Sequence, residues 1–229
     1  MLNDFEKHLR RENLSDNTIS AYLLTVRMYN QLSGEITKQN LLAFKGYLME
    51  TYKPKTVNLR IQAINKYLEF LKKDKLRLSA VKIQQKNFLE NVISDADYKF
   101  LKNSLKRDGN MEWYFVVRYL AATGARVSEL IQIKVEHVFK GFFDLYSKGG
   151  KLRRLYIPKK LKIETESWLK EKGIASGYLF LNRFGERITV RGISQQLKNY
   201  AIKYGLNPKV VYPHSFRHRF AKNFLEKFN

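Results

Sequence analysis

The sequence contains no cysteine, and acidic residues are scarce in it. Without cysteine there is no disulfide, no thiol nucleophile and no zinc site with thiolate ligands. This composition fits a reducing cytoplasm, where we expect the protein to be. No segment approaches the ~18 consecutive apolar residues of a membrane helix. The first residues, MLNDFEKHLRREN, are too charged for a signal peptide, so we expect no contact with a membrane.

The scarcity of acids leaves a large positive charge. Lys and Arg number 43 against 21 Asp and Glu, which gives a formal net charge of +22. Such a chain repels other copies of itself and attracts polyanions, nucleic acid first and an anionic membrane surface second. Hydrophobic residues make up 44% and aromatic residues 14% of the chain, enough for packed cores. We therefore predict a globular protein that binds nucleic acid, although a ribosomal or histone-like protein would have a similar charge.

Residues 1–75 have the pattern of a domain of short amphipathic helices. Apolar residues recur at helical spacing, beginning with Phe5 and Leu9. Ser15 and Thr37 are suited to cap the second and third helices, and Pro54 to open a fourth. Residues 76–91 are polar, basic and without a clear period, which predicts an interdomain linker.

The outer face of the fourth helix is rich in amide and cationic side chains. Asn and Gln can pair with adenine edges in a major groove, while Lys and Arg can hold phosphates. The alternative is an ordinary solvated face. The candidate DNA-binding residues on this helix are Lys55, Asn58, Arg60, Gln62, Asn65 and Lys66.

Residues 92–229 predict a second domain of mixed structure. An apolar helix ends at Thr123-Gly124, and another begins near Val127. Two β-prone runs flank Gly149-Gly150 and predict a hairpin. Pro213 opens a last helix whose apolar stripe is Phe216, Phe220 and Phe224. The fold class we expect is α+β, mainly α with a small β-hairpin, with a helical N-terminal domain and a mixed second domain.

The second domain also carries residues suited to phosphodiester chemistry. Attack at phosphorus builds negative charge on oxygen, which a guanidinium can meet with two donors. The departing oxygen needs a proton from a nearby Lys or His. Each candidate alone could be a surface charge or a helix cap. The candidates are Arg126, Glu129, Lys148, Lys151, His214 and Arg217.

Together these segments resemble the tyrosine recombinase, or phage integrase, family. Residues 123–130 (TGARVSEL) resemble its first arginine motif, and residues 147–153 (SKGGKLR) resemble its β-hairpin lysine segment. Residues 214–218 (HSFRH) resemble its His-x-x-Arg-His motif. The opening Leu14-Ser15-x-x-Thr18 and the helical first domain resemble its core-binding domain. The resemblance therefore covers nearly the whole chain, with residues 92–229 as the catalytic domain.

The resemblance implies a mechanism and a role for each residue. A tyrosine attacks phosphorus to form a 3′-phosphotyrosyl intermediate, with no metal and no other cofactor. Arg126 and Arg217 would clamp the scissile phosphate, and Glu129 would orient Arg126. Lys148, or alternatively Lys151, would be the general acid, while His214 would assist proton transfer with His218 in a supporting place. The partner would be double-stranded DNA. The full-length protein would be a homotetramer on DNA and a monomer off DNA.

The match stops before the nucleophile. In the family a Gly-His or Trp motif and then the tyrosine follow the histidine helix, whereas all 14 tyrosines here precede His214. We therefore name no nucleophile and expect residues 1–229 alone to be inactive for cleavage. The chain could be a fragment of a longer integrase or a shortened remnant. The alternative function is a sequence-specific DNA-binding module or repressor without catalysis, and a type IB topoisomerase would share the chemistry.

Overall fold

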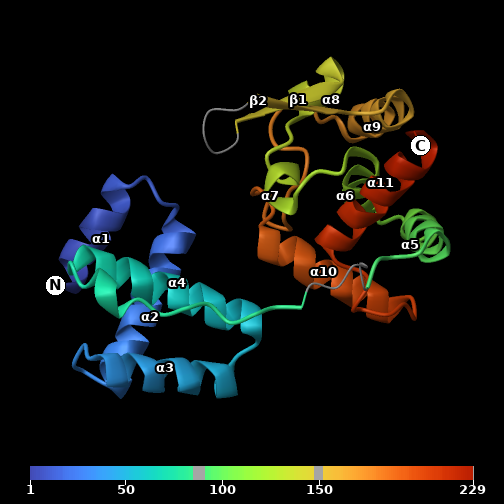
Figure 1. The fold of residues 1–229 in the computed structure, drawn as a ribbon. Helices are drawn as coiled ribbons and strands as arrows, with labels where there is room; N and C mark the ends of the chain where they lie inside the picture. Colours follow the sequence, from blue (N-terminus) through green and yellow to red (C-terminus); the bar gives the residue numbers. More distant parts are fainter. Residues whose placement is uncertain (85–90, 147–151, 229) are drawn as a thin grey trace. The chain divides into compact units, whose positions relative to one another are not determined.

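The computed structural model describes residues 1–84, 91–146 and 152–228. The chain divides into two compact units, Met1–Lys86 and Asn87–Asn229, each with its own hydrophobic core (Figure 1). The fold is mainly helical, with a two-stranded antiparallel sheet in the second unit, which confirms the predicted fold class. Within the described residues, no helix has both the length and the apolar character needed to cross a bilayer.

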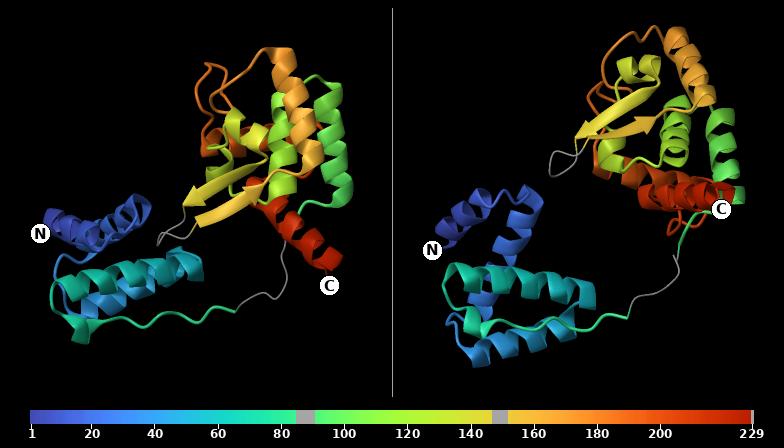
Figure 2. Two further views of the ribbon diagram at one scale, coloured as in Figure 1. Left: turned by 90° about the horizontal axis from the view of Figure 1, so that it is seen from above. Right: turned by 45° about the horizontal axis from the view of Figure 1, so that its top comes forward.

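All the regular secondary structure described in the first unit is helical. Its elements are α1 (Leu2–Arg11), α2 (Asp16–Leu32), α3 (Lys38–Thr51), α4 (Pro54–Phe70) and the 3-10 turn η1 (Asp74–Leu76). The predicted caps are confirmed: Ser15 Oγ accepts from the Thr18 N–H and Thr37 Oγ1 from the Asn40 N–H. Pro54 occupies the first turn of α4, where its missing N–H costs nothing. Helix α4 packs against α1, α2 and α3, and so forms the centre of this unit (Figure 2).

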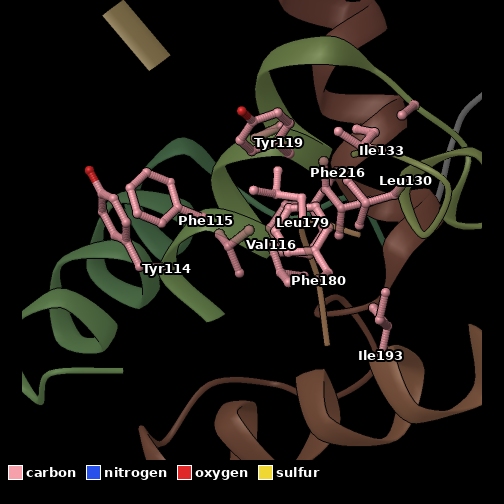
Figure 3. Close-up of a cluster of buried hydrophobic side chains, with 14 of the residues drawn as sticks. Tyr114, Phe115, Val116, Tyr119, Leu130, Ile133, Leu179, Phe180, Ile193 and Phe216 are labelled. Carbon is pink, nitrogen blue, oxygen red and sulfur yellow. The ribbon is translucent and has the colours of Figure 1, made fainter. Parts of the chain in front are cut away.

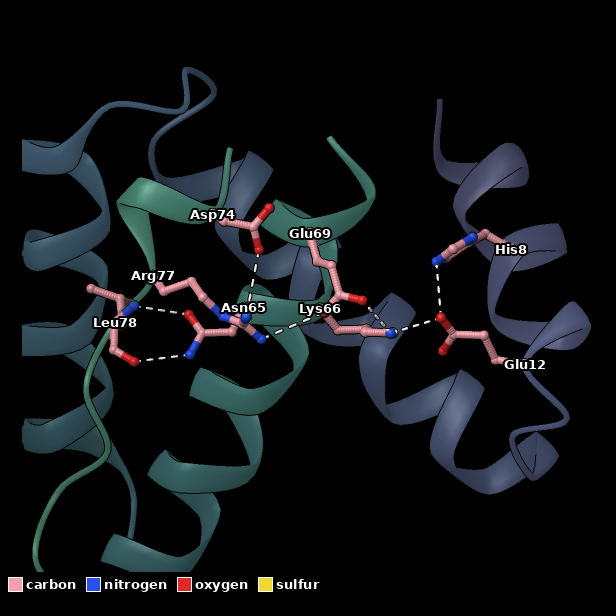
Figure 4. A network of polar contacts seen from close by, with 8 residues as sticks. All are labelled: His8, Glu12, Asn65, Lys66, Glu69, Asp74, Arg77 and Leu78. Atoms are coloured by element: carbon pink, nitrogen blue, oxygen red, sulfur yellow. Dashed lines mark hydrogen bonds and ion pairs between the residues drawn. The ribbon is translucent and has the colours of Figure 1, made fainter. Parts of the chain in front are cut away.

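Part of the predicted linker belongs to the first unit. Leu78 is only 5% exposed and lies in the core formed by α2, α3 and α4. The Asn65 amide accepts from the Leu78 N–H at 2.8 Å and donates to the Leu78 carbonyl at 2.9 Å (Figure 4). The Asn58 amide makes the same pair of bonds with Val81, at 2.8 and 2.9 Å. These two amides supply the hydrogen bonds of an extended segment and hold it against α4, so residues 78–81 belong to the first unit.

We expect Asn65→Ala to destabilise the first unit. The substitution removes two hydrogen bonds and leaves the Leu78 backbone groups without their partners, which costs about 1–3 kcal/mol of unfolding free energy. Gln62→Ala, on the exposed side of the same helix, is the matched control and should change stability by less than about 0.5 kcal/mol. Urea unfolding monitored by circular dichroism measures both. Equal stabilities of the two variants would contradict the role assigned to the amide pair.

The second unit surrounds one buried helix. Its elements are α5 (Asp95–Arg107), α6 (Met111–Thr123), α7 (Val127–Leu130), α8 (Val135–Lys140), β1 (Phe142–Tyr146), β2 (Leu152–Tyr156), α9 (Lys159–Lys172), α10 (Val190–Lys203) and α11 (Pro213–Phe228). Helix α6 is buried along most of its length and packs against α5, α7, α9 and α11. Figure 3 shows its side chains Phe115, Val116 and Tyr119 in one cluster with Phe216 of α11. The helix that ends at the arginine motif is therefore held on several sides.

The predicted hairpin is confirmed in its strands. Phe142 pairs with Tyr156 and Tyr146 with Leu152, in antiparallel register. One face, with Phe143, Leu145 and Leu155, is buried in the core. The opposite face is solvated, as expected for a hairpin that covers a helical core.

Helix α11 is fixed at its start by the core. Phe216 is fully buried, and Ser215 Oγ accepts a hydrogen bond of 2.7 Å from the Ile93 N–H. Pro213 opens the helix as predicted. The predicted apolar stripe is only partly inward, since the Phe224 side chain is 53% exposed. The first turns, where His214 and Arg217 lie, are thus the well-anchored part of the helix.

Candidate functional site

The site begins at the end of α6. Gly124 ends this helix in the left-handed region with φ of +60°. A Cβ atom at Gly124 would overlap the ring of Phe220, far inside van der Waals contact. Thr123 Oγ1 accepts from the Ala125 N–H at 3.2 Å and helps to turn the chain. Glycine is therefore required both for the turn and for the close approach of α11.

We expect Gly124→Ala to lower the unfolding free energy of the second unit by about 2–4 kcal/mol, because backbone strain and overlap with Phe220 add together. Gly109→Ala is the matched control. Gly109 has φ of +71°, but a Cβ atom there would meet nothing within 4 Å, so only the backbone cost of about 1–2 kcal/mol applies. Urea unfolding of the two variants separates these contributions. If the two variants lost the same unfolding free energy, overlap with Phe220 would contribute nothing to the effect of Gly124→Ala.

Arg126 lies directly after this turn, at the N-cap of α7. Its backbone N–H donates to Glu129 Oε2 at 2.7 Å, and its guanidinium Nη1 donates to Glu129 Oε1 at 2.8 Å. The Glu129 side chain is 12% exposed, while that of Arg126 is 53% exposed. One nearly buried carboxylate thus holds both ends of Arg126 and leaves much of the guanidinium facing solvent.

Arg217 reaches the same turn from α11. Its Nη1 donates to the Gly124 carbonyl oxygen, 93 residues away in the sequence. Burial lowers the pKa of the Arg217 guanidinium, and the positive charges of Arg153 and Arg126 lower it further, while Glu129 raises it. An arginine still keeps its charge under these conditions. The Arg217 guanidinium therefore lies at the turn that leads into Arg126.

Arg153 is a further member of this cluster that the sequence analysis did not single out. It lies on the same face of β2 as the buried Leu155, and its Nη1 lies 3.4 and 3.5 Å from the two Glu129 carboxylate oxygens. A cavity of about 710 Å³ opens between the hairpin and α7. Arg126, Glu129 and Arg153 line it, together with Ser128, Gln132, Asp144, Leu145 and Tyr146. Alternation along β2 would have been the signal, but the run Leu-Arg-Arg-Leu-Tyr has no clean period.

The two histidines of α11 occupy different surroundings. His214 is exposed and lies three residues before Arg217, hence on the same side of the first turns. The rings of His214 and His218 lie 6.2 Å apart. His218 lines a second cavity, between α11 and the start of α5, together with Ser94, Asp95 and Arg219. His214 is therefore exposed on the Arg217 side of the helix, whereas His218 lines the cavity at the start of α5.

The candidate general acids Lys148 and Lys151 lie outside the described residues. The hairpin strands on either side are described up to the Tyr146–Leu152 pair. Because Arg153 follows Lys151 by two positions and contacts Glu129, the lysine segment is joined to a strand that contacts the arginine cluster. The assignment of the general acid stays a prediction.

The six candidate DNA-binding residues of α4, called the α4 stripe below, divide into two groups. Asn58 and Asn65 hold the backbone of residues 78–81. Lys66 forms ion pairs with Glu12 at 2.7 Å and with Glu69 at 2.8 Å (Figure 4). Arg60 Nη1 donates to Thr25 Oγ1 at 2.8 Å and so ties α4 to α2. The remaining two members of the stripe, Lys55 and Gln62, have exposed side chains.

Comparison with known proteins decides the family. The model of the phage integrase family matches residues 91–228, which include all three motif segments. The chain belongs to the phage integrase family. Among curated relatives of this family, the tyrosine recombinase XerA of Pyrococcus furiosus is 30% identical over 99% of this chain and 80% of its own length. The TnP I resolvase of Bacillus thuringiensis is 27% identical over 97% of this chain and 85% of its own.

Solved structures of integrases share this fold. A lambda integrase tetramer bound to a Holliday junction matches with a TM-score of 0.77 at 15% identity, covering 100% of this chain and 73% of that one. The Tn1549 transposon integrase in complex with transposon right-end DNA matches with a TM-score of 0.74 at 15% identity, covering 99% and 86%. At this level of identity the likeness concerns the fold of both units. The structural match extends over the N-terminal helices, which precede the residues 91–228 matched by the family model.

Proposed function

We propose that residues 1–229 form the DNA-binding and strand-transfer core of a site-specific recombinase or integrase. One observation carries the proposal: the Arg217 guanidinium binds the Gly124 carbonyl, two residues from Arg126. The two arginines come from segments far apart in the sequence, and both lie near the turn at Gly124. Membership in the phage integrase family and similarity to tyrosine recombinases support the same function.

Within this function, Arg126 and Arg217 bind the non-bridging oxygens of the scissile phosphate. Each can offer two donors and a fixed charge to the oxygens that gain negative charge in the transition state. Glu129 sets the direction of Arg126, since it binds both its backbone and its side chain. His214 and Lys148, or Lys151, assist with the proton that the departing 5′ oxygen requires. The nucleophile is a tyrosine that residues 1–229 do not supply in the family's order.

The DNA duplex is the substrate, and the first unit provides part of its binding surface. Lys55 and Gln62 are the members of the α4 stripe that we assign to DNA, because their side chains are exposed. Off DNA the chain is a monomer, since a net charge of +22 opposes self-association. On DNA a tetramer of the full-length protein is supported by the similar lambda integrase, which forms a tetramer bound to a Holliday junction. Its place of action is the cytoplasm, where its DNA substrate lies.

The experiment has two stages. Selection from a random duplex library with residues 1–229 identifies a bound sequence, and a nicked suicide substrate of that sequence is then incubated with the protein. We expect retained DNA but no covalent adduct on a denaturing gel, because all 14 tyrosines precede His214. Extending the chain with the family's C-terminal motif and tyrosine should create the adduct. An adduct formed by residues 1–229 alone would overturn the proposal that the nucleophile is absent, and failure to retain any duplex would overturn the DNA-binding function.

A further inference from the structure

We infer that Arg153 is a positioning residue of the phosphate site, acting on Arg126 through the Glu129 carboxylate. The inference rests on the proposed function of Arg126 and Arg217 as phosphate ligands. Arg153 belongs to strand β2, Glu129 to helix α7, and Arg126 to the turn before α7. The chain of contacts therefore connects the hairpin with the arginine motif.

The contacts show which cation holds the carboxylate more closely. The Arg126 guanidinium donates to Glu129 Oε1 at 2.8 Å, whereas Arg153 Nη1 lies 3.4 and 3.5 Å from the two carboxylate oxygens. The Glu129 side chain is 12% exposed and that of Arg153 is 36% exposed, so the carboxylate is the more buried partner of this pair. Arg153 is the looser partner and lies on the cavity that Arg126 also lines.

The charge balance explains why a second cation on Glu129 matters. A carboxylate that pairs with Arg126 alone cancels most of the positive charge that Arg126 offers to a phosphate. When Arg153 shares the same carboxylate, two arginines divide one negative charge, and more of the positive charge of Arg126 is left for an anion. Arg217 lies within reach of the same charges: burial lowers its pKa, and the positive charge of Arg153 lowers it further. With Arg153 present, Glu129 still orients the Arg126 guanidinium, but it cancels less of the positive charge of that guanidinium.

The strand geometry gives the same residue a mechanical consequence. Leu155, two positions after Arg153 on the same face of β2, is buried in the core. Arg153 is therefore the last residue of this face before the lysine segment and holds that end of the strand against α7.

The neighbouring Arg154 provides a matched control. It points to the opposite face of β2, where it forms two hydrogen bonds with Asp144 at 2.7 and 2.8 Å. Arg153→Gln and Arg154→Gln remove the same charge from adjacent positions of one strand. Only the first removes a partner of Glu129, so a difference between them cannot come from net charge.

The test is titration of the chain with inorganic phosphate, followed through the Arg126 Nε–Hε signal in NMR spectra. We expect Arg153→Gln to weaken phosphate binding about tenfold, Arg154→Gln less than about twofold, and Arg153→Lys, which keeps the charge, to recover most of the affinity. In a Glu129→Gln background the Arg153→Gln change should cost less than about threefold, because the carboxylate through which it acts is gone.

The outcomes separate the two claims. If phosphate does not move the Arg126 signal in the unaltered chain, the proposed phosphate site itself fails. If phosphate binds but Arg153→Gln and Arg154→Gln weaken it equally, only the role of Arg153 fails. An undiminished effect of Arg153→Gln in the Glu129→Gln background would show direct action on the anion and overturn the positioning role. Arg153→Lys keeps the test valid if Arg153→Gln disturbs the hairpin.

Discussion

Raising the salt concentration from about 50 to about 200 mM is expected to weaken the binding of duplex DNA to this chain by about 10³–10⁵-fold. The reason is the release of counterions from the phosphates that lysines and arginines neutralise. A chain with 43 such residues and a net charge of +22 can readily engage the roughly 6–10 phosphates that this loss requires. Fluorescence anisotropy of a labelled duplex, measured over this range of salt, gives the slope of log affinity against log salt.

A pair of variants in the first unit tests which charges contribute. Lys55→Gln removes an exposed charge of α4 and should make the slope shallower by about 0.9, the contribution of one phosphate contact. Arg10→Gln removes the same charge from a side chain already paired with Glu6 and Asp16, and should leave the slope nearly unchanged. A slope near zero for the unaltered chain would rule out phosphate neutralisation as the basis of binding.

Local features of this fold were predictable because their causes lie within a few residues. Ser15 and Thr37 each accept a hydrogen bond from the backbone N–H three residues on, as their positions before amphipathic segments indicate. Gly124 ends α6 in the left-handed conformation that few other residues adopt. Caps and helix ends depend on short-range chemistry, so one sequence suffices to find them.

The roles of Asn58 and Asn65 could not be predicted in the same way. Their spacing on one helical face is compatible with base contacts and with internal hydrogen bonds. Which of the two holds depends on residues 78–81, a segment whose own pattern shows no period. Packing of Leu78 in the core gives the two amides internal backbone partners, and no local signal in a polar, basic segment reveals this packing.

The candidate site shows the same division. Arg126 and Glu129 are three residues apart, and their contact follows from the geometry of one helical turn. The approach of Arg217 depends on the packing of α11 against α6, and only the family resemblance pointed to it. Arg153 depends on which face of β2 turns inward, and a five-residue strand with two adjacent arginines does not specify this.

Loss of either Arg126 or Arg217 is expected to slow DNA cleavage by about 10²–10³-fold, the usual effect of removing one fixed donor to a transition-state oxyanion. The assay uses the chain extended by the family's C-terminal motif and tyrosine, with a nicked suicide substrate under single-turnover conditions. Arg126→Gln and Arg217→Gln each remove a charge that is already held in place, by Glu129 in one case and by the Gly124 carbonyl in the other. Preorganised charge of this kind acts mainly on the transition state, so binding of the intact duplex should change far less than the rate.

The control and the double variant decide whether the two arginines act on one phosphate. Arg107→Gln removes an exposed charge that pairs with Asp108 and should leave the cleavage rate within about twofold. If Arg126 and Arg217 bind the same phosphate, the double variant should lose less than the product of the single losses, because the second arginine has little left to stabilise once the phosphate is displaced. Fully multiplicative losses would place the two arginines at separate steps or separate phosphates. Unchanged rates in both single variants would show that the cluster around Gly124 is not the catalytic centre.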